Sequence, residues 1–219
     1  METAAGGRAI MVVGNGELPA GAADRIDSAD VVIRFNDCRS IGRGGWKTDI
    51  VAVCNTGRPA LAMLGGGQWK GHPAVRAAGA FWCVRDPVKY AAMRPILARS
   101  NPDLEDFCDD YTLGFKTFAT ASGRRCYVVP ASVHEALDDE LHALATSPYV
   151  VPSSGLVVVA EVLENLVRRN DRVILAGFGH SGWEWHPFAA ERAWVDRLVG
   201  AGMLERLSFP RDSNPEKSH

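Results

Sequence analysis

Short apolar runs alternate along the chain with segments of helical spacing and with turn-forming residues. Runs of apolar, largely β-branched residues that are bounded by glycine or polar residues are typical of strands buried in a sheet. Six such runs predict strands at residues 9–13, 31–35, 50–54, 80–84, 126–129 and 173–176.

Helices are predicted between these strands, at residues 88–99, 132–145, 157–169 and 187–199, with a brief helical turn at 24–30. Pro87 suits the first position of a helix. Ser132 and Glu135 have the spacing of a capping box, and Ser154 is a good N-cap for the apolar helix that follows it. The polar segment at 101–114 is expected to be a lid or a surface excursion.

Strands that alternate with helices predict an α/β fold with a Rossmann-like, mostly parallel sheet and helices on both faces. In such sheets ligands bind beyond the carboxyl ends of the strands. At 219 residues the chain fits one domain. We assign this domain to residues 1–209 and expect the polar residues 210–219 to form a flexible C-terminal tail.

Composition and charge exclude several classes of protein. The formal net charge of −2 favours neither nucleic acid nor an anionic membrane as a partner. No apolar run approaches the roughly eighteen residues of a transmembrane segment, and the first residues lack the apolar core of a secretory signal. The five cysteines are scattered without paired spacing, which disfavours zinc ribbons and disulfide frameworks and indicates a reducing, cytoplasmic setting.

The turn Gly14-Asn15-Gly16 follows the first predicted strand, where many folds of this class bind a dinucleotide. Pro19 stands where that fingerprint needs a third glycine, and Arg34 stands where it needs an acidic ribose ligand. A nicotinamide site is therefore disfavoured. The turn either contacts another nucleotide or is a structural turn in which Asn15 adopts a left-handed conformation.

His186 precedes Pro187 at the expected start of the last helix. The positive end of the helix dipole disfavours protonation, so we expect a lowered imidazole pKa and a neutral ring. A neutral histidine in a cleft can accept a proton from a hydroxyl group. The alternative is a ring that only packs beside Trp183 and Trp185.

Three further segments carry polar groups. The Ser-Ser-Gly segment at 153–155 marks a helix start, where amides and hydroxyls can bind an anion or simply cap the helix. The turn at 179–182 resembles the nucleophile elbow of a hydrolase, but Trp183 occupies the place of its second glycine. The two aspartates at 109–110 have no histidine beside them, so no metal site is expected.

Four segments resemble, in order, the sialylmotifs of the eukaryotic-type sialyltransferase family. Residues 12–16, 26–36 and 45–49 resemble its large motif, residues 152–156 through 177–178 its small motif, and residues 186–191, with the pattern His-x4-Glu, its very small motif. The resemblance covers about residues 10–55 and 150–200. The chain also resembles short bacterial proteins named urease operon accessory protein.

The resemblance implies a variant of the nucleotide-sugar glycosyltransferase fold and an inverting, metal-independent transfer that needs no cofactor. The donor would be a sialic-acid-like or Kdo-like sugar activated with cytidine monophosphate (CMP), and the acceptor a glycan or glycolipid. His186 would be the general base, and Glu191 would support its motif structurally. The residues implied in nucleotide and donor binding are Asn15, Gly16, Asn36, Ser153, Ser154, Gly155 and His180.

The chain departs from this family in two respects. Ile10 occupies the place of the cysteine that links the large motif to the small one, and no membrane anchor is expected. Two other functions stay open: a non-catalytic, nucleotide-binding accessory protein associated with a urease operon, and a hydrolase of CMP-sugars.

Overall fold

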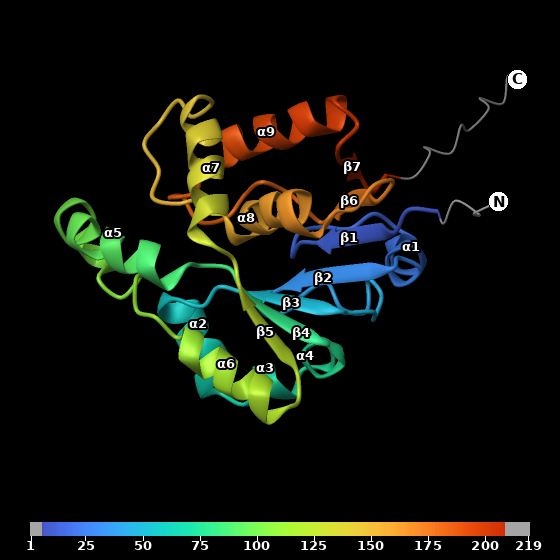
Figure 1. The fold of residues 1–219 in the computed structure, drawn as a ribbon, viewed down its shortest axis with the longest axis horizontal. Helices are drawn as coiled ribbons and strands as arrows, with labels where there is room; N and C mark the ends of the chain where they lie inside the picture. Colours follow the sequence, from blue (N-terminus) through green and yellow to red (C-terminus); the bar gives the residue numbers. More distant parts are fainter. Residues whose placement is uncertain (1–5, 209–219) are drawn as a thin grey trace, which may run out of the picture.

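The computed structural model of the protein describes residues 6–208 (Figure 1). The tail predicted at 210–219 lies outside these residues. A parallel sheet with the strand order β5-β4-β3-β2-β1-β6-β7 forms the centre of the fold. The strands are β1 (Ala9–Val13), β2 (Val31–Phe35), β3 (Ile50–Val53), β4 (Ala80–Cys83), β5 (Arg125–Val128), β6 (Arg172–Ala176) and β7 (Glu205–Arg206).

Helices cover both faces of the sheet (Figure 1). One face carries α7 (Ala131–His142), α8 (Ser154–Glu161) and α9 (Phe188–Gly200). The other carries α1 (Ala22–Asp27), α2 (Gly57–Gly65), α3 (Gln68–Gly71), α4 (Pro73–Ala77) and α6 (Thr112–Ala121). α5 (Pro87–Ser100) lies to the side of the sheet. The prediction of an α/β fold with a mostly parallel sheet covered on both faces is confirmed.

The inner strands are apolar throughout because each contributes to two cores. Ile10 and Val12 of β1 join the core under α7, α8 and α9, whereas Met11 and Val13 join the core under α1. All four side chains are buried. Strands covered on both faces are continuous apolar runs rather than alternating ones, so the six predicted strands agree with the observed ones to within one residue at each end.

Two predicted helix starts are wrong. α7 begins after Pro130, so Ser132 is its second residue rather than its cap. The N-cap of α8 is Ser153, not Ser154, because the Ser153 Oγ accepts a hydrogen bond of 3.3 Å from the backbone N–H of Leu156. α8 then continues as a π-helical turn, Val162–Leu166, and ends before the predicted residue 169.

The topological switch point, where the direction of strand addition reverses, lies between β1 and β6. The chain adds strands outward from β1 to β5 and then returns to place β6 on the other side of β1. The loops after these two strands touch: the N–H of Gly14 donates to Ala176 O (2.8 Å) and that of Gly16 to Gly177 O (3.0 Å). A Cβ atom on Gly14 or Gly16 would lie 2.4 or 2.7 Å from the Gly177 carbonyl oxygen. Glycine at both positions therefore permits this close approach.

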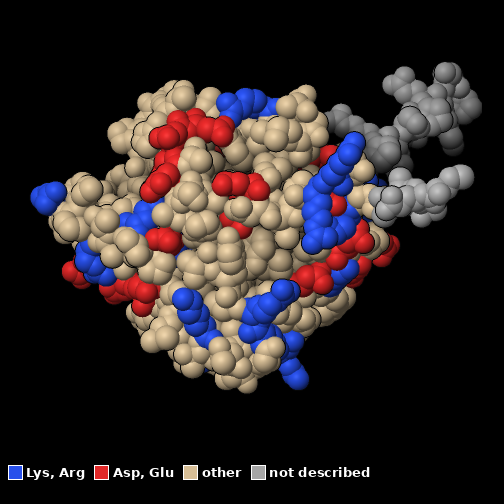
Figure 2. Space-filling view, viewed as in Figure 1, with Lys and Arg blue, Asp and Glu red and all other residues tan. Residues whose placement is uncertain are grey.

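The surface carries charges of both signs. Basic and acidic side chains are interspersed over the face shown in Figure 2, and neither sign covers it. No helix within residues 6–208 is long and apolar enough to cross a membrane.

Candidate functional site

Two hollows open at the carboxyl edge of the sheet. The first, the crevice, has a volume of about 530 Å³ and lies at the switch point between β1 and β6. The second, the side pocket, has a volume of about 360 Å³ and lies beyond the ends of β3 and β4. Asn36, Ser154, Trp183 and His186 line both hollows. The crevice is lined by all nine residues that the resemblance implicates: Asn15, Gly16, Asn36, Ser153, Ser154, Gly155, His180, His186 and Glu191.

A buried carboxylate holds the start of α8 in place. Glu191, in the first turn of α9, is 1% exposed, and its oxygens accept hydrogen bonds from the backbone N–H (2.6 Å) and the hydroxyl (2.7 Å) of Ser153. Burial raises the pKa of Glu191, while the two bonds from Ser153 oppose that rise. Ser153 thus joins α8 to α9, and the amides of Ser154 and Gly155 are left at the start of the helix without intrahelical acceptors.

His186 is held in one tautomer. Its Nδ1 lies 2.8 Å from the carbonyl oxygen of Val151, and because a carbonyl only accepts, Nδ1 carries the proton and Nε2 is left as an acceptor. The ring packs edge-on against Trp183 and Phe188, with centroid distances of 4.9 and 5.5 Å. The imidazole is therefore positioned by both a hydrogen bond and aromatic packing.

Burial lowers the pKa of His186 to about 4; the bond to Val151 opposes this shift and the positive charge of Arg85 adds to it. The direction agrees with the expectation from the sequence, but the main cause differs. α9 begins at Phe188 with Pro187 as its N-cap, so His186 precedes the helix, and burial is the largest cause of the lowered pKa. The ring is neutral at pH 7.

His180 lies at the other end of the crevice, in the loop after β6, with a left-handed φ of 46°. Its Nε2 accepts a hydrogen bond of 3.4 Å from Arg206. Burial, followed by the charges of Arg206 and Arg192, lowers its pKa to about 4. Arg206 also pairs with Asp196 at 2.8 Å. Because Nε2 of His180 accepts from Arg206, the neutral ring carries its proton on Nδ1.

Asn15 connects the loops after β1 and β2. Its Nδ2 donates to Phe35 O (3.3 Å) and to Asp37 Oδ1 (3.2 Å), and its Oδ1 accepts from the backbone N–H of Arg39 (3.0 Å). The side-chain amide is thus used within the protein, and Asn15 shapes the crevice through these loops. The left-handed conformation considered for Asn15 is wrong: the non-glycine residues with positive φ among residues 6–208 are Asn36, Cys38, Asn170 and His180.

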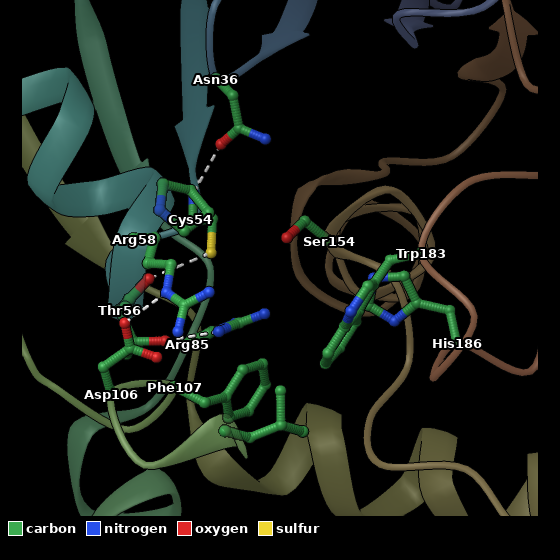
Figure 3. A pocket seen from close by; sticks show the side chains of 13 residues that line it. Asn36, Cys54, Thr56, Arg58, Arg85, Asp106, Phe107, Ser154, Trp183 and His186 are labelled. Atoms are coloured by element: carbon green, nitrogen blue, oxygen red, sulfur yellow. Dashed lines mark hydrogen bonds and ion pairs between the residues drawn. The ribbon is translucent and has the colours of Figure 1, made fainter.

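Asn36 lies between the two hollows. Its Oδ1 accepts a hydrogen bond of 2.8 Å from the backbone N–H of Cys54 (Figure 3), and its carbonyl oxygen accepts one of 2.7 Å from Trp69 Nε1. The Nδ2 of Asn36 has no protein acceptor within residues 6–208. This N–H₂ group is available to a ligand in either hollow.

Gly155 brings the start of α8 against an aromatic ring. A Cβ atom at this position would lie 3.0 Å from the Cε1 atom of Phe178. Phe178, which also lines the crevice, packs edge-on against Phe35 at a centroid distance of 6.1 Å. Gly155 therefore allows the helix start to approach the crevice wall closely.

No candidate from the sequence lies in the far wall of the side pocket. This wall contains Thr56, Arg85 and Phe107, and Figure 3 shows them across the pocket from Ser154, Trp183 and His186. Thr56 follows β3 and Arg85 follows β4. The available signal was the position of Arg85, a charged residue directly after a buried strand and before a capped helix, at the edge of the sheet where ligands bind.

The aspartates at 109–110 bind protein groups. Asp109 pairs with Arg94 at 2.7 Å, and Asp110 accepts hydrogen bonds from the backbone N–H and the hydroxyl of Thr112. Within residues 6–208, no three His, Cys, Asp or Glu side chains lie close enough to hold a metal ion together. Independence from metal stays a prediction.

Comparisons with known proteins give one relative and several similar structures. No protein-family model matches the chain. Over 201 residues it is 60% identical to the urease operon 23 kDa accessory protein of Rhizobium meliloti (strain 1021), across 92% of this chain and 93% of the relative.

The fold is similar to that of a mammalian sialyltransferase, with a TM-score of 0.53 and 15% identity over 92% of this chain and 69% of that chain. It is also similar to the sialyltransferase CstII from Campylobacter jejuni, solved in complex with a substrate analogue, cytidine-5'-monophosphate. That match has a TM-score of 0.50 and 11% identity over 91% of this chain and 79% of that chain. At these identities the likeness shows the fold.

Proposed function

Because the chain belongs to the family of the Rhizobium meliloti urease operon 23 kDa accessory protein and its fold is similar to that of sialyltransferases, we propose that it is a glycosyltransferase that uses a CMP-activated sugar. The proposal rests on the placement of His186, which is neutral and lies where the two hollows meet. The donor is a sialic-acid-like or Kdo-like sugar, and the transfer inverts its anomeric centre without a metal.

We assign the binding of the donor to the crevice. The amides of Ser154 and Gly155 lie at the start of α8, where the helix dipole and free N–H groups favour a phosphate or carboxylate. The Nδ2 of Asn36 and the Nδ1–H of the neutral His180, whose Nε2 accepts from Arg206, add further donors. CstII, whose fold is similar, was solved with CMP.

We assign the binding of the acceptor to the side pocket, where its hydroxyl can meet His186. The Nε2 of His186 takes the proton of the acceptor hydroxyl while the hydroxyl oxygen forms a bond to the anomeric carbon. The bond between that carbon and the phosphate oxygen breaks, and CMP leaves with the electron pair. With a pKa of about 4, His186 needs no prior deprotonation at pH 7. A positioned base contributes about 10²–10⁴-fold in rate.

His186→Ala is expected to lower transfer from a CMP-sugar by about 10²–10⁴-fold, because the base is lost. The dissociation constant of CMP should change less than about twofold, since the crevice amides remain. CMP release from CMP-N-acetylneuraminate, with a panel of glycans as acceptors, measures the first quantity and calorimetry the second. His142→Ala, at an exposed histidine, is the control.

A thermal-denaturation panel of cytidine, uridine, adenosine and guanosine monophosphates tests the donor class separately. A nucleotide at one hundred times its dissociation constant should raise the unfolding free energy by about 2.7 kcal/mol. CMP is expected to give the largest effect. A preference for the adenine nucleotide, or equal loss of CMP binding and turnover in His186→Ala, would contradict the proposal.

The name of the Rhizobium meliloti relative favours a second candidate, a nucleotide-binding accessory protein without turnover. In that case wild-type protein binds CMP but releases none from any CMP-sugar. A hydrolase differs from both, because it releases CMP at the same rate with and without an acceptor. The assays above separate all three.

We further propose that residues 1–209 form one domain that acts in the cytoplasm. One continuous sheet runs through the described part of the chain. The five cysteines are free thiols, and the Sγ atoms of Cys83 and Cys126 lie 3.8 Å apart. Unpaired buried thiols support a reducing compartment.

A further inference from the structure

Arg85 is a buried cation in the wall of the side pocket, and it is 6% exposed. Its guanidinium carbon lies 4.2 Å from the ring centroid of Phe107 and 5.0 Å from that of Tyr90. Its Nη1 donates a hydrogen bond to the hydroxyl of Thr56. The remaining guanidinium N–H groups have no acceptor within residues 6–208.

These free N–H groups of Arg85 face open space. Among residues 6–208, the buried side-chain nitrogen or oxygen atoms that lack a hydrogen-bond partner consist of His134 Nδ1 alone. The unbonded nitrogens of Arg85 are therefore not sealed inside the protein, and the hollow that Arg85 lines is the side pocket.

Arg34, another buried arginine, shows what a purely structural guanidinium looks like in this fold. It is 0% exposed, and every nitrogen of its guanidinium donates to a protein oxygen. The acceptors are Lys47 O, Thr48 Oγ1, Ser40 Oγ and Gly44 O. Arg85 has one such bond, to Thr56. Its guanidinium packs against the rings of Phe107 and Tyr90, and its other N–H groups are left without a protein acceptor.

The groups around Arg85 supply no negative charge. Burial raises the pKa values of the Tyr90 hydroxyl and the Cys108 thiol, so both are uncharged at pH 7. The carboxylate that lines the side pocket, Asp106, is paired with Arg58 at 2.6 Å. The side pocket therefore keeps one positive charge without a partner.

A buried charge without a partner is unfavourable, and it persists in a folded protein when a ligand completes it or when function requires it. A guanidinium presents parallel N–H groups that match the oxygens of a carboxylate or a phosphate. Aromatic rings on its faces fix the plane of the guanidinium and leave its edge for such a ligand.

We propose that Arg85 binds a negatively charged group, a carboxylate or a phosphate, on the molecule that occupies the side pocket, so that the acceptor is an acidic sugar. This inference rests on the proposed function, which assigns that pocket to the acceptor. A volume of about 360 Å³ accommodates a monosaccharide unit. Arg85 and His186 lie on opposite walls (Figure 3), so the anion is anchored on one side while a hydroxyl faces Nε2.

Three probes with the same pyranose ring test this inference: glucose, glucuronate and glucose 6-phosphate. Each is titrated into the protein, with and without saturating CMP, and binding is followed by NMR. At least one anionic probe is expected to bind tenfold or more tightly than glucose. The tighter of the two identifies a carboxylate or a phosphate as the preferred group.

Two variants locate the effect. Arg85→Met is expected to weaken the anionic probe at least tenfold and leave CMP affinity within about twofold. Arg85→Lys keeps the positive charge but lacks the parallel N–H groups of a guanidinium, so its affinity for the anionic probe is expected to lie between those of wild type and Arg85→Met. Arg99→Met, at an exposed arginine of α5 that does not line the side pocket, serves as the control, with anion affinity within about twofold of wild type.

Equal or absent binding of the three probes by the wild-type protein overturns the inference without any variant. Anion binding that survives in Arg85→Met also overturns it. If CMP affinity falls in parallel in that variant, Arg85 binds the nucleotide phosphate and the acceptor assignment is wrong. Tight glucuronate binding by a wild-type protein that does not bind CMP counts against the proposed function and leaves the anion site standing.

Discussion

The carboxylate of Glu191 is buried and accepts hydrogen bonds from the backbone N–H and the hydroxyl of Ser153. These two bonds fix the start of α8 at the crevice. The geometry supports the structural role that the resemblance implies for Glu191. It also explains why the carboxylate pKa is raised by burial rather than lowered by a cation. The same residue thus determines which amides remain free for a ligand.

Glu191→Ala is expected to lower the free energy of unfolding by about 2–4 kcal/mol, because it leaves the partly buried N–H of Ser153 without its protein acceptor and creates a cavity at the buried Glu191 side chain. Glu191→Gln keeps one oxygen acceptor and should cost less than half as much. Urea denaturation measures both. Glu184→Ala, at an exposed carboxylate, should stay within about 0.5 kcal/mol of wild type. A buried-site variant no less stable than this control would contradict the assignment.

Single residues differ in how far the sequence predicts them. His186 and Glu191 stand in a recognisable pattern, so both are predicted. Arg85 stands outside any motif, and its importance depends on what surrounds it: two aromatic rings and no carboxylate in ion-pair distance within residues 6–208. Those neighbours come from α5 and from the loop before α6, and no local pattern reveals them.

At the scale of elements, the strands are predicted well because a strand that is buried on both faces is a continuous apolar run in the sequence. β7 is missed because it has two charged residues and pairs with β6 alone. The helices between β3 and β5 are short or mixed in polarity, so periodicity does not mark all of them. Helix starts fail by one residue where two candidate caps adjoin, as at Ser153 and Ser154.

Gly14→Ala tests the contact between the loops after β1 and β6. The new Cβ atom would lie 2.4 Å from the Gly177 carbonyl oxygen, which is backbone and cannot move without shifting the loop. We expect a loss of about 2–4 kcal/mol in unfolding free energy and weaker nucleotide binding, because both loops line the crevice.

Gly200→Ala is the matched control for this prediction. Gly200 ends α9, and a Cβ atom there would meet nothing within 4 Å. Alanine in a helix is favoured over glycine by up to about 1 kcal/mol, so this variant should be neutral or stabilising. Equal destabilisation by the two substitutions would show that the loop contact has no special importance.

At the scale of the whole molecule, segments more than one hundred residues apart in the sequence meet because the parallel strands end at one edge of the sheet. This rule places all nine predicted residues around the crevice. The rule gives the edge but not the shape of a pocket. The side pocket depends on how α5 and the loop after it pack, and this packing is not encoded in a local pattern.

Three histidines, His134, His180 and His186, have pKa values lowered chiefly by burial, to about 4 for the last two. In the unfolded chain a histidine has a pKa of about 6.5. Between these values the unfolded chain binds protons that the folded chain does not, so stability is complete above about pH 6.5 and is lost as the pH falls towards 4. The raised carboxyl pKa values of Glu161 and Glu191 act in the opposite direction and offset part of this loss.

The free energy of unfolding at pH 5 is therefore expected to be about 2–4 kcal/mol below its value at pH 7. Urea denaturation at the two pH values measures the difference. Replacing His180 and His186 together by glutamine should remove at least half of it, since glutamine does not titrate. His142→Gln, at an exposed histidine, should leave it unchanged. The contrary outcome is a double variant whose free energy of unfolding falls as much between pH 7 and pH 5 as that of wild type. The two imidazoles would then be protonated in the folded protein at pH 5, and a neutral His186 would be ruled out at that pH.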